Sequence, residues 1–333
     1  MSRHLISMLD LGERTRTILD LAARIKESPA DHRSALASKS LGMIFEKPST
    51  RTRVSFEVAM VQLGGHALNL SPKDLQIGRG ETTADTAKVL SRYLDGIMYR
   101  AFSNEMMREL AANSSVPVIS GLDDREHPCQ IVGDLLTVRE HCGKLGGLTL
   151  AYVGDGNNVC NSLMLGCALA GVNFVGACPE GFDPDGELFA KAEALAARGR
   201  ARMAIVRDPL KAVRGADVIY TDVWVSMGDE KEAAEREQVF APYQVNQSLM
   251  DVAPHALFMH CLPAHRGYEV TDEVIDSDRS IVWDQAENRL HAQKAILVDL
   301  LGEGEVATQV GPAPVVAPPK AAKKKKAPKR RGK

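Results

Sequence analysis

The chain has 333 residues, of which 44% are hydrophobic and 25% are charged, an ordinary composition for a folded, water-soluble protein. No apolar run approaches the roughly 20 residues that a membrane helix needs, and the start MSRHLISMLDLGERTR lacks the apolar stretch of a signal peptide. These features argue against a membrane protein and predict a cytoplasmic one. A chain of this length usually exceeds one hydrophobic core, so two domains are expected.

The formal net charge of -2 hides an asymmetry between the body of the chain and its end. Residues 320–333 (KAAKKKKAPKRRGK) hold nine of the 41 Lys and Arg residues and no acid, which leaves 32 basic against 43 acidic residues and a body near -11. The segment 303–333 is rich in Pro, Ala and Lys and poor in large apolar groups, so we expect a disordered basic tail. The six cysteines show no CxxC pair and no tight framework, which predicts free thiols.

Along the chain, apolar runs of strand length alternate with segments of helical periodicity, which predicts an α/β fold of two domains, each a mainly parallel sheet flanked by helices. In the first half, strands are predicted at 41–45, 66–70, 97–100 and 116–119, and helices at 52–63, 85–94, 104–112 and 130–141. The Gly-rich segment CGKLGG at 142–147 then interrupts the pattern. We therefore predict domains at 1–145 and 146–302.

The same alternation restarts after this break. Strands are predicted at 148–153, 172–177, 202–206, 218–220, 257–260 and 281–283. A long helix at 285–301 then closes the fold and is expected to pack back toward the first domain. Because ligands of parallel sheets gather at the carboxyl ends of strands, polar residues at those ends are the candidates for a site.

The first such segment is EKPSTRTR, at 46–53, between a predicted strand and a predicted helix. Ser49 is a good N-cap, and the free N–H groups of the first helical turn, the helix dipole, Arg51 and Arg53 together favour an anion such as phosphate. The alternative is a capped helix start with solvated arginines.

HPCQ, at 127–130, follows the strand predicted at 116–119, and Arg100 ends the strand before it. A guanidinium, the His127 imidazole and the Gln130 amide can each donate a hydrogen bond to a carbonyl oxygen that gains negative charge. The alternative for His127 is a buried histidine bonded to backbone. Zinc is not expected, since no second spaced pair of ligands accompanies His127 and Cys129.

GDGNN, at 154–158, ends a predicted strand and superficially resembles a dinucleotide-binding turn. Val159 stands where GxGxxG requires its third glycine, and the next strand does not end in an acid, so no nicotinamide cofactor is expected. Asn158 remains as a polar group able to bind the carboxylate or amine of a small ligand.

DVWVSMG, at 222–228, follows another predicted strand. Asp222 can pair with an ammonium group, and the loop that contains Ser226 and Met227 could fold over a ligand. The alternative is an ordinary surface loop.

HCLPAHRG, at 260–267, follows the last inner strand, and Arg289 lies on the closing helix. A thiol beside a histidine suggests a cysteine nucleophile. In a strand, however, neighbouring side chains point to opposite faces, so His260 is poorly placed to take a proton from Cys261.

Taken in order, STRTR (49–53), Arg100, HPCQ, GDGNN, DVWVSMG, HCLPAHRG and AENR (286–289) resemble the ornithine carbamoyltransferase family over roughly residues 5–302. The resemblance implies a carbamoyl phosphate domain and an ornithine domain that close on each other, and transfer of the carbamoyl group to ornithine in arginine and citrulline metabolism. It implies homotrimers, possibly assembled further, with a residue matching Gln76 reaching a neighbouring subunit's site. No metal or cofactor is required.

The resemblance also assigns the site residues. Those implied to hold the phosphate match Ser49, Thr50, Arg51 and Thr52. Those implied to reach the carbamoyl group match Arg100, His127 and Gln130, and those implied to bind ornithine match Asn158, Asp222, Ser226 and Met227. Those implied to complete the site match Cys261, Leu262 and Arg289.

The implied chemistry is attack of the neutral δ-amine on the carbamoyl carbon through a tetrahedral intermediate. Thr52, Arg100 and His127 stabilise the oxyanion, while Cys261 and Asp222 orient ornithine and favour its deprotonated side chain.

Three other functions fit parts of the sequence. Transfer to aspartate would call for basic residues at 222 and 226–228 and for HPLP in place of HCLP, whereas transfer to putrescine is less easily excluded. Nucleic-acid binding has support only in the basic tail, where no aromatic residues accompany the charges, so it is at most accessory.

Overall fold

The computed structural model describes residues 3–71, 75, 80–225 and 233–302. The predicted basic tail and the predicted site residues Gln76, Ser226 and Met227 lie outside these ranges. Among the described helices, none is both long enough and apolar enough to cross a membrane.

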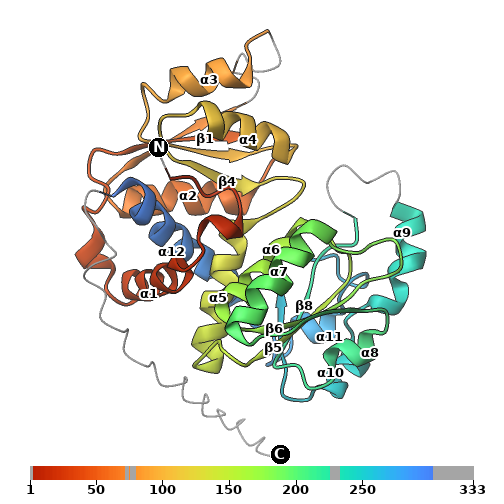
Figure 1. The fold of residues 1–333 in the computed structure, drawn as a ribbon. Helices are drawn as coiled ribbons and strands as arrows, with labels where there is room; N and C mark the ends of the chain where they lie inside the picture. Colours follow the sequence, from red (N-terminus) through yellow and green to blue (C-terminus); the bar gives the residue numbers. More distant parts are fainter. Residues whose placement is uncertain (1–2, 72–74, 76–79, 226–232, 303–333) are drawn as a thin grey trace, which may run out of the picture.

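The described chain forms two parallel-sheet domains flanked by helices (Figure 1). The first sheet has the order β2-β1-β3-β4, with β1 at Ser40–Phe45, β2 at His66–Leu70, β3 at Gly96–Arg100 and β4 at Val118–Leu122. The helices of this half are α1 (Arg14–Glu27), α2 (Thr50–Gln62), α3 (Thr83–Leu90), α4 (Asn104–Asn113) and α5 (Pro128–Cys142). Short 3-10 turns lie at Met8–Asp10 and Pro29–His32.

The second sheet has the order β7-β6-β5-β8-β9. Its strands are β5 (Thr149–Val153), β6 (Asn173–Ala177), β7 (Met203–Val206), β8 (Val218–Thr221) and β9 (Leu257–His260). Its helices are α6 (Asn158–Ala170), α7 (Gly186–Gly199), α8 (Pro209–Val213), α9 (Ala233–Phe240), α10 (Gln247–Val252) and α11 (Asp272–Ile275), with a 3-10 turn at Ala241–Tyr243.

Residues 143–148 join the two sheets, with Gly143 and Gly147 at φ of 73° and 82°. A domain boundary inside this segment stays a prediction. The last helix, α12 (Val282–Leu301), leaves the second sheet and packs against α1, α2 and α5 (Figure 1). Helix α5 also contacts α6, so α5 links the two halves.

The strand predicted at 281–283 is wrong, because helix α12 begins at Val282 and only Ser280 bridges to the last strand. Ile-Val-Trp favours a strand locally, but Trp283 and Asp284 are both exposed, which breaks the alternation that a half-buried strand needs. The burial of Val282, Gln285 and Arg289 instead follows helical spacing. The chain therefore turns directly into the closing helix.

Both sheets have a place where the order of strands reverses, and this is where ligands bind in open parallel sheets. In the first sheet it lies between β1 and β3, and in the second between β5 and β8. Four loops therefore begin at these places, after β1, β3, β5 and β8, and they contain the segments EKPSTRTR, GDGNN and DVWVSMG. HPCQ and HCLPAHRG follow the neighbouring strands β4 and β9.

Candidate active site

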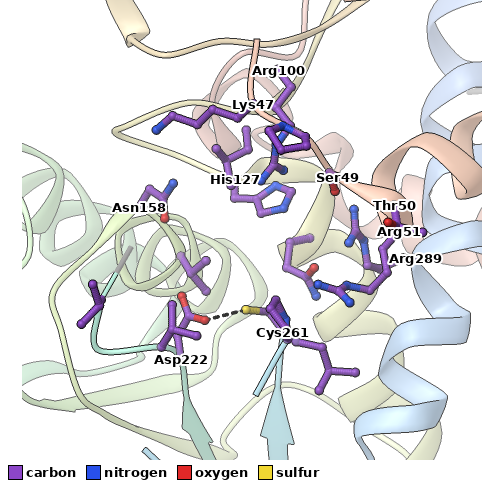
Figure 2. Close-up of a pocket in the computed structure, with 18 of the residues that line it drawn as sticks. Lys47, Ser49, Thr50, Arg51, Arg100, His127, Asn158, Asp222, Cys261 and Arg289 are labelled. Atoms are coloured by element: carbon purple, nitrogen blue, oxygen red, sulfur yellow. Dashed lines mark hydrogen bonds between the residues drawn. The ribbon is translucent and has the colours of Figure 1, made fainter. Parts of the chain in front are cut away.

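A pocket of about 370 Å³ lies where these loops meet, between the two halves (Figure 2). It contains eleven of the residues predicted from the sequence, namely Ser49, Thr50, Arg51, Arg100, His127, Gln130, Asn158, Asp222, Cys261, Leu262 and Arg289. Figure 2 shows Arg51 and Arg289 on one side, Asn158 and Asp222 on the other, and His127 between them. The pocket therefore has a cationic wall facing an acidic one.

The cationic wall begins at the N-terminus of α2. Ser49 has an extended backbone and caps the helix, accepting a hydrogen bond from the Thr52 N–H at 3.3 Å. Thr50 and Arg51 follow in the first turn, where free N–H groups and the helix dipole favour an anion. Arg51 lines the pocket, whereas Arg53 is exposed and does not.

Thr52 lies behind the pocket wall. Its side chain is fully buried, and its hydroxyl accepts a hydrogen bond from Arg289 Nη2 at 2.8 Å. This bond holds the Arg289 side chain, which comes from α12, against α2. Gly133 on α5 allows α12 to pack closely at the same residue, since a Cβ there would lie 3.3 Å from the Arg289 backbone.

Arg100 ends β3 and is 5% exposed. Its Nη1 donates to Gly121 O at 3.4 Å, and its Nε has no partner among the described residues. Burial, followed by the charges of Arg289 and Arg51, lowers the pKa of Arg100 to about 10, so the side chain stays cationic near pH 7. Three buried or half-buried cations gathered in this way are stabilised by a multiply charged anion.

His127 lies directly before α5, and its backbone N–H donates to Ser162 Oγ at 2.8 Å. Its ring Nδ1 has no partner among the described residues. Burial, with Arg289 and Arg100 nearby, lowers the pKa of His127 well below its ordinary value. The imidazole is therefore neutral near pH 7, with one N–H to donate and one nitrogen to accept.

The acidic wall centres on Asp222, just after β8. Cys261 donates its S–H to Asp222 Oδ1 at 2.8 Å, and Asn157 Nδ2 donates to Asp222 Oδ2 at 2.9 Å (Figure 2). Burial, followed by the charge of Asp222, raises the pKa of Cys261 well above its ordinary value. Cys261 is therefore a neutral thiol near pH 7. Asn158 lies beside them and donates to Asp123 O at 2.5 Å.

The His260 ring is hydrogen-bonded to groups other than the thiol beside it. Its Nε2 lies 3.0 Å from Glu269 Oε1, and its Nδ1 accepts the Leu262 N–H at 2.8 Å. Ligand atoms of Asp222, His260 and Cys261 lie within 4.8 Å of one another, a spacing that could suit a metal ion. Both ring nitrogens of His260 already have protein partners, so the ring serves neither as a base for Cys261 nor as a ready ligand.

Sequence reasoning missed several residues that line the pocket, namely Lys47, Pro48, Leu122, Val159, Val223, Val225, Pro263 and His265. Two lining residues have a strained backbone, Leu122 with φ of 144° and Leu262 with φ of 58°. Such strain gathers at functional sites and costs on the order of 1–3 kcal/mol per residue. A leucine in a sequence gives no sign that its backbone is strained. Lys47, by contrast, lies inside the polar segment before α2 and could have been predicted from it.

Comparisons with known proteins agree over the whole described chain. Residues 3–140 match the family model described as "Aspartate/ornithine carbamoyltransferase, carbamoyl-P binding domain", and residues 146–300 match the one described as "Aspartate/ornithine carbamoyltransferase, Asp/Orn binding domain". An ornithine carbamoyltransferase of Methanopyrus kandleri is 56% identical over 90% of this chain and 98% of its own.

Two further relatives are a protein named as catabolic and a protein of known structure. A protein of Thermoplasma volcanium named "Ornithine carbamoyltransferase, catabolic" is 51% identical over 90% of this chain and 98% of its own. The solved structure of the Pyrococcus furiosus ornithine carbamoyltransferase aligns with a TM-score of 0.87 and 52% identity, over 91% of this chain and 98% of that one.

Proposed function

The chain belongs to the aspartate/ornithine carbamoyltransferase family and is a carbamoyltransferase, and from this premise we propose that it converts carbamoyl phosphate and L-ornithine to L-citrulline and phosphate. The observation that carries the choice of acceptor is the wall formed by Asp222 and Cys261, which faces the arginines across one pocket. An ammonium group suits such a wall. The side-chain carboxylate of aspartate would instead meet the carboxylate of Asp222.

The phosphate of carbamoyl phosphate would bind at the start of α2. Ser49, Thr50 and Arg51 line this end of the pocket, and Arg289 reaches it from α12. The N–H groups of the first turn and the guanidinium of Arg51 are donors suited to a phosphate dianion. Thr52 supports this site by holding Arg289 through its hydroxyl.

The carbamoyl group would then lie among Arg100, His127 and Gln130. Arg100 Nε can donate to the carbonyl oxygen, because it is buried and without a partner among the described residues. A neutral His127 can donate one N–H to the same oxygen. As negative charge develops there in the transition state, these donors bind more strongly, which is how the site accelerates the reaction.

Ornithine would bind against Asn158 and Asp222, with Ser226 and Met227 from the segment that follows, and with Cys261 and Leu262 where the two substrates meet. Both walls then place the δ-amine next to the carbamoyl carbon, which supplies much of the rate by proximity.

The reaction makes a C–N bond, breaks a C–O bond and moves one proton from nitrogen to phosphate. The neutral δ-amine attacks the carbamoyl carbon and forms a tetrahedral intermediate, in which the new C–N bond leaves positive charge on nitrogen and negative charge on oxygen. The intermediate collapses by breaking the C–O bond to phosphate, and the departing phosphate takes the proton from nitrogen. A covalent carbamoyl-enzyme is not part of this scheme. Since one comparably similar relative is named catabolic, the proposal covers either direction of arginine and citrulline metabolism.

We also propose a homotrimer in which Gln76 completes a neighbouring site. Apolar side chains exposed on one half support an interface: Val54 and Val61 lie two turns apart on α2 and are 53% and 64% exposed, and Leu68 on the edge strand β2 is 38% exposed. If Arg51→Ala and Gln76→Ala subunits are each inactive, mixed trimers should recover activity. No recovery after verified subunit exchange would mean that each site is built within one chain.

The proposed activity is tested by incubating the purified chain with carbamoyl phosphate and ornithine. Citrulline and phosphate should form in equal amounts. Phosphate release without citrulline would refute the transfer.

A further inference from the structure

The carboxylate of Asp134 lies on α5, one helical turn after Gln130, and does not line the pocket. It is 1% exposed and accepts three hydrogen bonds. Gln130 Nε2 and Gln285 Nε2 both donate to Oδ1 at 2.8 Å, and the Tyr220 hydroxyl donates to Oδ2 at 3.0 Å. Helix α5, helix α12 and strand β8 therefore meet at one buried acid.

The direction of these hydrogen bonds follows from groups that can only donate. The backbone N–H of His260 donates to Gln285 Oε1 at 3.0 Å, so the other end of that amide, its NH2 group, must face Asp134. The same NH2 group also lies 3.1 Å from the Tyr220 oxygen, which leaves the hydroxyl proton of Tyr220 for Asp134 Oδ2. The carboxylate is thus surrounded by donors.

The orientation of the Gln130 amide is fixed by Asp134 itself. An ionised carboxylate only accepts hydrogen bonds, so Gln130 must turn its NH2 group toward Asp134. Its oxygen Oε1 then faces the other way, and it is buried without a partner among the described residues. Because Gln130 lines the pocket, this oxygen is an acceptor held ready for a ligand.

We propose that Asp134 is a positioning residue, which orients the Gln130 amide so that its oxygen accepts a hydrogen bond from the NH2 group of the donor substrate and so selects a carbamoyl group over an acetyl group. The inference rests on the proposed function and deepens it. Among the neighbouring side chains of the pocket, Arg100 and Arg289 carry only donors, and His127 offers a single neutral ring. With the Gln130 amide reversed, two NH2 groups would oppose each other.

Two stable phosphonates test this selection directly. Phosphonoacetamide carries C(=O)NH2 and 2-oxopropylphosphonate carries C(=O)CH3, and the two molecules are otherwise alike. Calorimetry on the full chain without ornithine gives the ratio of their Kd values. We expect wild type to bind the amide at least about tenfold more tightly, the effect of one hydrogen bond to a buried group.

Variants at residue 134 should abolish the preference. In Asp134→Ala the acceptor is removed and a water can enter, and in Asp134→Val the space is filled. Either variant, if folded by circular dichroism and thermal melting, should bring the ratio to within about twofold of one. Asp134→Asn keeps an acceptor oxygen for both glutamines and should retain the ratio to within about threefold.

Two controls separate orientation from a loss of packing. Tyr220→Phe removes a different hydrogen bond from the same carboxylate and leaves that of Gln130, so its ratio should match wild type. In a Gln130→Ala background, Asp134→Ala should change the ratio no further, because Asp134 acts through Gln130.

The outcomes distinguish the inference from the proposed function. If wild type forms citrulline but binds both phosphonates equally, or if a folded Asp134→Ala or Asp134→Val keeps the full ratio, the inference is overturned and the function stands. If Tyr220→Phe loses the ratio as Asp134→Ala does, the effect is structural and the inference is also overturned. If wild type forms no citrulline, both fall together.

Discussion

At the scale of single residues, the pocket divides its charges between two walls. Arg51 and Arg289 lie on one side and Asp222 on the other, with Arg100 and His127 between them (Figure 2). The His127 imidazole and the Cys261 thiol are both neutral near pH 7. Carbamoyl transfer needs this division, since one substrate brings a phosphate dianion and the other an amine. Each wall can be tested by changing one residue in it.

Arg51 and Arg53 give a matched pair for the cationic wall. Both lie in the first turn of α2, but only Arg51 lines the pocket. Arg51→Ala should weaken phosphonoacetamide binding at least about tenfold, because a charge-assisted bond contributes about 1.5–3 kcal/mol. Arg53→Ala, which removes the same charge from the same helix, should change the Kd by less than about threefold. Equal effects in calorimetry would show that the charge acts only at long range.

Cys261 separates direct transfer from covalent catalysis. Its thiol is neutral near pH 7 and donates to Asp222, and the ring of His260 is bonded elsewhere. A sequential mechanism should therefore hold, and Cys261→Ser should keep measurable turnover, with the KM of ornithine raised more than that of carbamoyl phosphate. Parallel double-reciprocal plots, together with a carbamoylated Cys261 trapped without ornithine, would overturn this account.

Asp134 should also make the free energy of unfolding depend on pH. Burial raises its pKa from 3.8 to about 6, so between these values the folded chain holds a proton that the unfolded chain releases. This proton stabilises the folded state below pH 3.8, and the stabilisation is lost as pH rises from there through about 6. Relative to Asp134→Asn, wild type should lose on the order of 3 kcal/mol of unfolding free energy between about pH 4 and 6.5. A difference that does not vary with pH in urea denaturation would contradict the burial argument.

Eleven of the residues that line the pocket could be predicted, because most of them lie in short polar segments at strand ends. The network around Asp134 could not be predicted, since Tyr220 and Gln285 are 86 and 151 positions away in the chain. Each of these residues looks ordinary alone. Only the packing of α5 against α12 and β8 brings them together.

At the scale of elements, the contact between α5 and α6 joins the two halves behind the site. Gly166 on α6 allows this contact, since a Cβ there would lie 2.4 Å from Ile131 Cγ2 and 3.5 Å from Leu135 Cδ1. A helix would normally gain up to about 1 kcal/mol from Gly→Ala. At this position overpacking should outweigh that gain.

Gly166→Ala should therefore lower the unfolding free energy by about 1–3 kcal/mol. Gly186, the first residue of α7, provides the control, because nothing lies within 4 Å of the Cβ that it would receive. Gly186→Ala should leave stability unchanged or raise it slightly. If denaturant titrations give the same change in unfolding free energy for both variants, Gly166 is not required for the close packing of α5 and α6.

Most strands and helices follow from periodicity, and the errors have local causes. The strand predicted at 281–283 was wrong because three β-forming residues outweighed the helical spacing that begins at Val282. Helix α3 ends at Leu90 rather than at 94, because the chain turns there, with Arg92 and Tyr93 bonded back to Val89 and Leu90. Local propensity decides such ends less than the packing of the neighbouring elements does.

At the scale of the whole molecule, function depends on the two halves facing each other. The first half provides the proposed anion site and the second provides Asn158, Asp222 and Cys261, while α12 carries Arg289 from the second half back to the first. The alternating pattern of the sequence predicted both halves. Subunit assembly has no comparable periodic signal, so the proposed trimer rests on the resemblance and on the exposed apolar side chains of α2 and β2.

The choice of acceptor tests the central claim most directly. Initial rates with carbamoyl phosphate should be compared for ornithine, putrescine, N-acetylornithine and aspartate. We predict the highest kcat/KM for ornithine, with aspartate at least about a hundredfold lower because its side-chain carboxylate would face Asp222 without a partner. Aspartate or putrescine accepting the carbamoyl group as well as ornithine does would contradict the account.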